Sequence, residues 1–263
     1  YHHGFFDPVE REFRGFGRVE RQDAETFDLA TPLEPGKAAA ALPKDRSHDV
    51  SPILTKTWYH TGAYAEAHII SQQYAGEYYK GDKLASYDKD DKLVSALPDS
   101  TLDAQFKEYP ERKIEAYRAL HGHVLHEEVY GLDHKHNPSL ENPKLDEHPY
   151  TVTESNFYVK LLQAKADQNA AVCLVHPCET ISYHYERNPA DPRVEHTFTT
   201  QVDGFGHVLE SCHVFYSRRK GESAHPEQQQ PQLKALVTVD SFINAEAGDY
   251  PKNDLHHLGV PRK

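Results

Sequence analysis

The stretch HTFTTQVDGFGHVLES (196–211) decides the fold class, because two strand-like segments meet in it at one compact turn. Threonine, phenylalanine and valine favour strands, whereas aspartate and glycine favour tight turns. Asp203 can accept turn hydrogen bonds through its side chain, and Gly204 and Gly206 can adopt positive φ. The stretch therefore predicts an antiparallel hairpin with these three structural turn residues.

Further strand signals lie on both sides of this hairpin. Their regular spacing, with turn-forming clusters at 188–192 and 203–206, predicts an antiparallel meander in the second half of the chain. The strands expected there are 149–162, 171–176, 180–186, 195–203, 207–217 and 233–244. In the first half, where the signal is weaker, short strands with a bend are expected in 1–27, 13–19 among them, and further strands at 53–60 and 124–130.

One helix interrupts the strand pattern. Apolar residues recur at helical spacing between 99 and 120, but Pro110 divides them. Proline is tolerated in the first turn of a helix, so the pattern predicts a helix from Pro110 to Leu120, ended by Gly122. The polar stretches that contain prolines are expected to be loops: 29–50 and 131–148.

The fold class expected from these patterns is mainly β. It is an antiparallel sheet meander with one short helix near 110–121 and long polar loops. A tentative division assigns mixed strand, loop and helix to 1–137, antiparallel β structure to 146–245, and a tail to 246–263. Aromatic residues of the expected strands would supply sheet contacts: Phe13, Phe16, Trp58, Tyr59, Tyr183 and Tyr185.

Composition excludes several classes of protein. Only 38% of the 263 residues are hydrophobic, which is low for a globular domain, but 11% aromatic residues exclude a disordered chain. No run approaches the roughly 20 apolar residues of a transmembrane helix, so direct membrane insertion is not expected. A net charge of −12 opposes phosphate backbones and argues against nucleic-acid binding. Because the sequence contains no methionine, we expect a fragment of a larger protein.

The 19 histidines require a test for a metal site. His121, His123 and His126 form an H-x-H-x-x-H pattern, but Leu125 stands where related hydrolases place an aspartate. On a strand, His126 would also point away from the face that His121 and His123 share. The alternative is a helix end, where histidine interacts favourably with the helix dipole. We therefore expect no metal and no other cofactor here.

Cys173, His176 and Cys178 form a second cluster of possible metal ligands. Their spacing matches no standard zinc knuckle, and cysteine in a buried strand behaves as a small hydrophobic residue. Three cysteines also do not describe a disulfide framework. The serines lack a G-x-S-x-G elbow, so a serine nucleophile is not expected either.

Five longer motifs occur in one order along the chain. They are GFFDPVEREFRGFGRVE (4–20), LTKTWYHTGAY (54–64), YRALHGHVLHEEVYGLD (117–133), HPYTVTESNFYV (148–159) and HPCETISYHYERNPADPRVEH (176–196). This order resembles the middle region of the B component of insecticidal toxin complexes, which are SpvB-like, RHS-containing proteins. The resemblance covers roughly residues 1–245. The hairpin at 196–211 also resembles an RHS or YD-type unit.

The resemblance implies a structural role. In such complexes, B and C components build a hollow β-sheet shell around a cytotoxic polypeptide, and a β-propeller of B docks on a pore-forming A component. The implied function is a secreted, non-catalytic wall segment. Its implied partners are the remaining parts of the same polypeptide, a C-type RHS toxin component and, indirectly, the A component. No catalytic residue transfers, and the S-T-S strand of the ADP-ribosyltransferase domains that SpvB-like proteins can carry is absent.

Two alternatives stay open at this point. One is a metal-dependent hydrolase that uses His121, His123 and His126. The other is a glycan- or receptor-binding β module that uses surface tyrosines, Trp58 and aspartates. If the chain is a wall segment, the sheet edges at its two ends should pair with neighbouring parts of a longer polypeptide.

Overall fold

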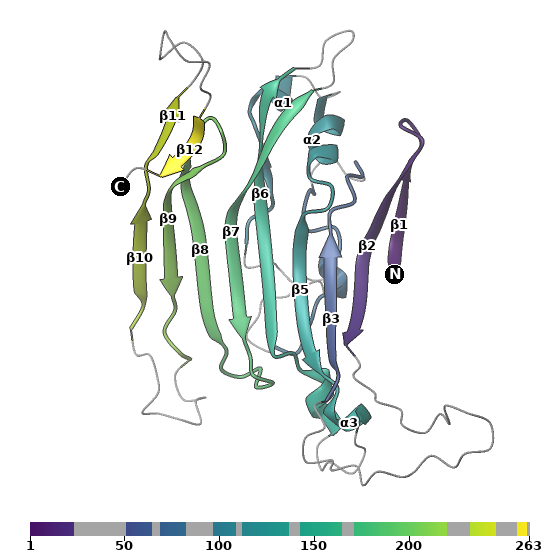
Figure 1. Cartoon of the computed structure of the whole chain (residues 1–263). Helices are drawn as coiled ribbons and strands as arrows, with labels where there is room; N and C mark the ends of the chain where they lie inside the picture. Colours follow the sequence, from purple (N-terminus) through teal and green to yellow (C-terminus); the bar gives the residue numbers. More distant parts are fainter. Residues whose placement is uncertain are drawn as a thin grey trace, which may run out of the picture.

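The computed structural model shows an open antiparallel sheet, seen face-on in Figure 1. The residues that the structure describes are 1–23, 51–64, 69–82, 97–108, 112–136, 143–164, 171–219, 232–245 and 257–261. The loop expected at 29–50 lies outside these residues. No helix within these ranges has the length and apolar character needed to cross a membrane.

The main sheet of the described chain has ten strands in the order β1-β2-β3-β5-β6-β7-β8-β9-β10, with β4 beside β6. Every neighbouring pair is antiparallel except β4 with β6. The strands are β1 (His2–Asp7), β2 (Glu12–Asp23), β3 (Ile53–Tyr59), β4 (Thr101–Leu102), β5 (Val124–Gly131), β6 (Thr151–Gln163), β7 (Val172–His184), β8 (Arg193–Val202), β9 (Val208–Phe215) and β10 (Lys234–Val239). The expected mainly β, antiparallel fold is confirmed.

The prediction of two strands at 171–176 and 180–186 is wrong, because β7 runs through both without a break. Pro177 has no backbone N–H to donate, and proline inside a sheet usually sits at a bulge. The pairing of β7 with β6 shifts register at this place, since Asn156 pairs with Glu179 but Phe157 pairs with Pro177. The extra residue, Cys178, absorbs the proline while the strand continues.

The single strand expected at 233–244 is also wrong. β10 ends at Val239, and after Asp240 and Ser241 the chain forms β11 (Phe242–Ala245). β11 leaves the main sheet and pairs with β12 (His257–Pro261) in the region expected to be a tail. In the first residues, where short strands with a bend are expected, the chain forms the two strands β1 and β2.

The expected helix is confirmed as α2 (Lys113–Ala119), and Pro110 lies outside the described residues. Gly122 follows with φ +81°, which suits the end of a helix. The short helical turns are α1 (Gln105–Glu108), α3 (Asp133–His136), η2 (Ala75–Glu77) and η4 (Pro143–Glu147). The described parts of the expected loop 131–148 therefore contain the helical turns α3 and η4 instead of irregular chain.

The two faces of the sheet differ in burial. Along the first half of β6, Val152, Glu154 and Asn156 are buried, whereas the residues between them are half-buried. Residues 69–82 cover the buried side, where the Tyr79 N–H donates to Glu128 of β5. We call this side the covered face and the opposite side the open face. Figure 1 looks onto the open face, and residues 69–82 lie behind the strands.

The main apolar core lies where α2 packs against β6 and β7. It is a cluster of large side chains from helix and strands: Ile70, Phe106, Ala116, Tyr117, Leu120, Leu125, Phe157, Val159 and Leu161. A second, smaller cluster joins Trp58 of β3 to Ala75 and Tyr78 of the covering segment. These two clusters fix α2 and residues 69–82 to the sheet.

Candidate functional site

The three histidines of the H-x-H-x-x-H pattern do not converge. The His121 Nε2–H donates to the Arg14 carbonyl at 2.6 Å, while His123 Nδ1 lies 3.1 Å from the Leu120 carbonyl. His126 points into the covered face, where its ring stacks on Tyr78 at 3.7 Å between centroids. In the described part of the chain, no three His, Cys, Asp or Glu side chains are arranged to hold a metal ion.

His126 belongs to a buried polar network around Glu128. The Glu128 carboxylate accepts hydrogen bonds from His126 Nε2 at 3.0 Å, the Tyr130 hydroxyl at 2.7 Å and the Tyr79 N–H at 2.5 Å. Burial opposes ionisation of Glu128, but these donors and the charge of His126 outweigh it and lower the pKa of the carboxyl. Glu128 and His126 are each only 1% exposed, so the network holds the covering segment and faces no open cleft.

The cysteine cluster is divided between different environments. Cys173 packs against the core beside α2, and Cys178 is the extra residue of the β7 bulge. Burial raises the pKa of Cys173, and burial together with Glu179 raises the pKa of Cys178 to about 11. His176 lies beside Tyr158, 5.5 Å between ring centroids. Both thiols stay protonated near neutral pH, which makes them poor nucleophiles and poor metal ligands.

The aromatic residues singled out in the sequence occupy different environments. Trp58 is 1% exposed and its Nε1–H donates to Glu77 at 3.1 Å, so it is not the surface residue that the glycan-binding alternative requires. Tyr185 is buried, and Tyr59 and Tyr183 are half-buried. Phe13 is 53% exposed, and Phe16 lies at the border of exposure at 36%.

The hairpin turn between β8 and β9 is built around Asp203. Its Oδ1 accepts from the N–H groups of Phe205 at 2.8 Å and His207 at 2.9 Å, and its Oδ2 contacts His207 Nδ1 at 2.9 Å. Gly206 has φ +93°, whereas Gly204 does not adopt positive φ. A side chain that satisfies three turn donors, together with one left-handed glycine, closes the hairpin.

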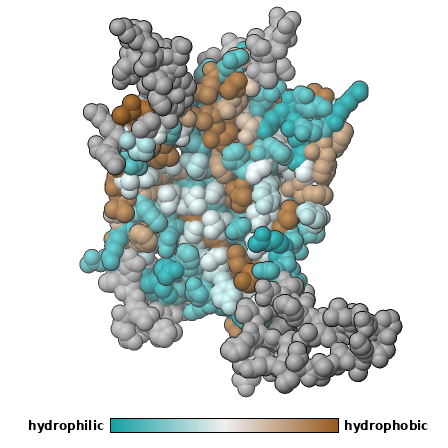
Figure 2. Space-filling model, viewed as in Figure 1, coloured by the Kyte–Doolittle hydropathy of each residue, from teal (hydrophilic) through white to brown (hydrophobic). Residues whose placement is uncertain are grey.

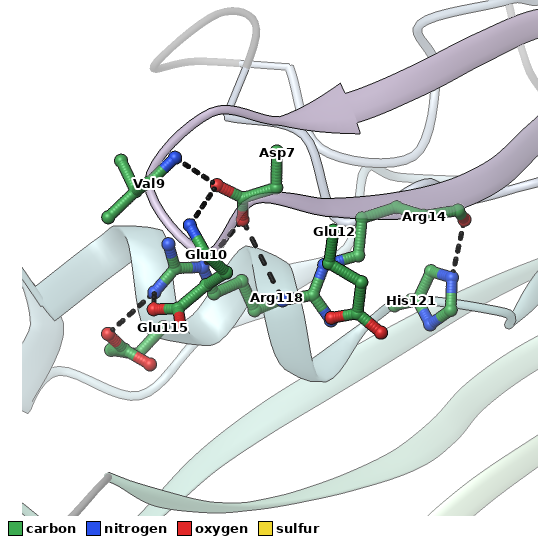
Figure 3. A network of polar contacts seen from close by, with 8 residues as sticks. All are labelled: Asp7, Val9, Glu10, Glu12, Arg14, Glu115, Arg118 and His121. Atoms are coloured by element: carbon green, nitrogen blue, oxygen red, sulfur yellow. Dashed lines mark hydrogen bonds and ion pairs between the residues drawn. The ribbon is translucent and has the colours of Figure 1, made fainter.

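A network that the sequence did not reveal joins the β1–β2 hairpin to α2 (Figure 3). Asp7 is 5% exposed and accepts from the N–H groups of Val9 at 2.9 Å and Glu10 at 3.2 Å, and from Arg118 Nε at 3.2 Å. Burial opposes ionisation, but these donors outweigh it and lower the pKa of Asp7. Arg118 Nη1 also contacts Glu115 at 3.1 Å.

Two further arginines, which follow β9, form ion pairs near the β8 and β9 strands. Arg218 binds Asp191 at 2.8 Å, and Arg219 binds Asp82 of the covering segment at 2.8 Å. The Arg187 guanidinium contacts Asp133 and lies over the Tyr150 ring at 4.5 Å. These partners are separated by 27 to 137 positions in sequence, so no local pattern could have indicated them.

A cavity of about 390 Å³ opens between β1 and residues 61–63 and 69–76. The titratable side chains in its lining are His3 and Tyr74. His3 is already paired with Glu77 at 2.7 Å, and the rings of His3 and Tyr74 stack at 5.1 Å. The cavity therefore lacks the convergence of ionisable groups that an active site needs.

The feature that stands out is an unpaired sheet edge at β10. Within the described chain, β10 pairs only with β9. Its apolar side chains are exposed on both faces, with Leu236 at 61%, Val237 at 57% and Val239 at 72%. An exposed, apolar edge strand of a soluble protein is normally paired or blunted, so β10 is a candidate interface.

Comparison with known proteins places the chain among toxin-complex proteins. A family model described as the insecticide toxin TcdB middle/C-terminal region matches residues 115–246. No curated protein matches the sequence. The crystal structure of TcdB2–TccC3 without the hypervariable C-terminal region is similar at 28% identity and a TM-score of 0.66, covering 99% of this chain and 11% of that chain.

Two related assemblies match equally well. The crystal structure of TcdB2–TccC3–Cdc42 has 28% identity and a TM-score of 0.67, covering 99% of this chain and 11% of that chain. The Photorhabdus luminescens Tc holotoxin pore with a mutation in TccC3 has 27% identity and a TM-score of 0.66, with the same coverage of 99% and 11%. The chain thus spans about a ninth of the length of these chains.

Proposed function

Because the chain belongs to the family of the insecticide toxin TcdB middle/C-terminal region, we propose that it is a non-catalytic wall segment of a toxin-complex B-like protein. In this role, the sheet is one panel of an RHS-like shell that encapsulates a toxin payload and couples it to a delivery channel. The secreted character of the chain is part of the same proposal. Residues 1–263 would be a fragment whose segments 1–137 and 146–245 contribute strands to one sheet, followed by the tail 246–263.

The β10 edge carries this proposal. The N–H of Asp240 donates to the Leu209 carbonyl at 2.8 Å, which makes these two residues a hydrogen-bonded pair. Because such pairs alternate along an antiparallel ladder, the N–H groups of Val237 and Val239 point away from β9. The free edge therefore offers both backbone donors and apolar side chains to a further strand. We assign that strand to the remainder of the same polypeptide.

The partners follow from the similar structures. TcdB2 is found in complex with TccC3, and the Tc holotoxin pore contains a chain similar to this one. We therefore propose a C-type component as the direct partner of the B-like protein and a pore-forming A component as an indirect one. The buried polar networks support a role in assembly, because their groups hold the sheet and its covering segment together.

The test is Val237→Pro in the full-length B-like protein, with Val237→Thr as the matched control. Proline removes an outward N–H that β9 does not use, so β10 stays in place while the next strand loses a donor. We expect Val237→Pro to reduce the yield of closed complex with the C-type component in size-exclusion chromatography, and Val237→Thr to leave it unchanged. A normal yield of complex from Val237→Pro would contradict the proposal.

A further inference from the structure

A small cavity on the covered face lies between residues 69–82 and strands β5 and β6. We infer that this cavity is a site for a single buried water molecule, which bridges the Tyr78 hydroxyl and the Glu154 carboxylate. The bridge joins the covering segment to the sheet. It is independent of the wall role, because every group that holds the water belongs to the described part of this chain.

The volume and lining of the cavity identify its occupant. The volume is about 10 Å³, and a buried water needs roughly 10–15 Å³. The lining includes the polar side chains of Ser71, Gln72, Tyr78, Glu154 and Asn156. Apolar cavities of this kind stay dry, whereas polar ones hold water that makes two to four hydrogen bonds. The cavity therefore suits one water molecule and is too small for a larger ligand.

The position of the cavity separates this water from the surrounding solvent. Tyr78, Glu154 and Asn156 are all buried on the covered face. The opposite, open face of the sheet is the side seen in Figure 2, where residues of weak hydropathy, drawn pale, gather over the middle. Water on the open face belongs to the bulk, whereas a water beneath residues 69–82 is held by protein groups.

Hydrogen bonding within the lining leaves one group to be satisfied. Three of the polar side chains donate to other parts of the protein: Ser71 to the Asp99 carboxylate at 2.6 Å, and Gln72 and Asn156 to backbone carbonyls at 3.0 and 2.9 Å. The Tyr78 hydroxyl, in contrast, has no hydrogen-bond partner among the described residues. A buried tyrosine hydroxyl usually finds a partner, and the water supplies it.

The charges on the two sides of the cavity determine how the water is oriented. Burial and the nearby Glu154 carboxylate raise the pKa of Tyr78, so its hydroxyl stays protonated and can donate. An ionised carboxylate only accepts hydrogen bonds, and it has room for several. A water molecule can accept from Tyr78 and donate to Glu154, which makes it the natural link between these two groups.

The water would also steady the buried network beside it. The Tyr78 ring stacks on His126 at 3.7 Å between centroids, and His126 Nε2 lies 3.0 Å from the Glu128 carboxylate. Glu128 in turn accepts from the Tyr79 N–H. Because the water holds the hydroxyl end of the Tyr78 ring, it helps to position the ring on which His126 stacks.

The test is a crystal structure of the full-length B-like protein at a resolution that shows buried waters. Two variants accompany it. Tyr78→Phe removes the hydroxyl that faces the cavity. Tyr79→Phe is the matched control, because it removes the neighbouring hydroxyl, which lies 2.7 Å from His148 Nδ1.

We expect one density peak in the cavity, roughly 2.5–3.0 Å from both the Tyr78 hydroxyl and the Glu154 carboxylate. The peak should be lost in Tyr78→Phe and retained in Tyr79→Phe. An empty cavity in the parent protein would overturn the inference, and so would an unchanged peak in Tyr78→Phe. Contacts of roughly 2.0–2.6 Å to several oxygens would also overturn it, because they would identify a metal cation. If Tyr78→Phe does not fold, the parent structure alone decides.

Discussion

Gly131, the last residue of β5, allows the closest approach between the sheet and the turn that follows β7. A Cβ at this position would overlap the Arg187 guanidinium and lie 2.8 Å from Tyr150 Cε2. Arg187 would have to leave its contacts with Asp133 and Tyr150 to make room. We predict that Gly131→Ala lowers the free energy of unfolding by about 1–3 kcal/mol, measured by urea denaturation.

Gly204 provides the matched control for this substitution. Nothing lies within 4 Å of a Cβ built there, and its φ is not positive. Gly204→Ala should therefore change stability by no more than about 0.5 kcal/mol. Equal effects of the two alanine substitutions would show that the Arg187 contacts do not constrain the end of β5.

His60 makes the stability of the fold depend on pH. It is 1% exposed, and its Nδ1 accepts from the Gly62 N–H at 3.0 Å. Burial lowers the pKa of His60 from 6.5 to about 4. Between these two pH values, His60 is protonated in the unfolded chain but not in the folded chain. The free energy of unfolding therefore decreases as pH falls from 6.5 towards 4. The loss from this group alone is roughly 3 kcal/mol at most.

The variant that isolates this effect is His60→Asn, since an amide oxygen can replace the Nδ1 acceptor. We predict that the decrease in stability between pH 6.5 and pH 4.5 is smaller in the variant than in the parent chain. Urea denaturation at several pH values measures the two slopes. Parallel slopes would mean that His60 is protonated as readily in the folded as in the unfolded state.

At the scale of elements, one carboxylate ties the turn of the β1–β2 hairpin to α2. Asp7 accepts from two N–H groups of its own turn and from Arg118 of α2 (Figure 3). In Asp7→Asn the amide group would face the Arg118 guanidinium, donor against donor. We predict faster amide hydrogen exchange throughout β1 and the start of β2, with no change in β8 and β9.

Glu12→Gln is the control for the hairpin, because Glu12 contacts Arg14 at the surface with 60% of its side chain exposed. Surface ion pairs contribute little, so its exchange pattern should match the parent chain. Unchanged exchange in Asp7→Asn would indicate that strand pairing with β2 and β3 alone holds the hairpin.

Strand positions could be predicted from the sequence because their signals are local. β8, β9 and the turn at Asp203 follow from alternating β-forming residues and a compact Asp–Gly cluster. The unbroken β7 could not be predicted, since Pro177 reads as a strand end unless the partner strand shows where a bulge fits. The separation of β10 from β11 likewise depends on β12, a partner distant in sequence.

The polar contacts between distant segments could not be predicted for a similar reason. Asp7 and Arg118 are 111 positions apart, and Arg219 and Asp82 are 137 positions apart. The fold brings such distant residues together, so their spacing in the sequence forms no recognisable motif. Conversely, the H-x-H-x-x-H pattern is local in sequence but is split between a helix end and a strand, so its histidines acquire different partners.

At the scale of the whole molecule, the described chain forms an open sheet whose β10 edge is unpaired. One face is covered by residues 69–82, the other presents hydroxyl groups, and β10 leaves donors and apolar side chains free. These properties fit the proposed role as a part of a larger closed structure. The account therefore depends on what lies beside β10 in the complete protein.

The most direct measurement is an experimental structure of the full-length B-like protein in complex with its C-type partner. The account predicts that the outward N–H groups of Val237 and Val239 pair with a strand from outside residues 1–263, and that the extended sheet encloses a lumen. A structure in which β10 stays a solvent-exposed edge, or in which the panel stands apart from any closed wall, would contradict it.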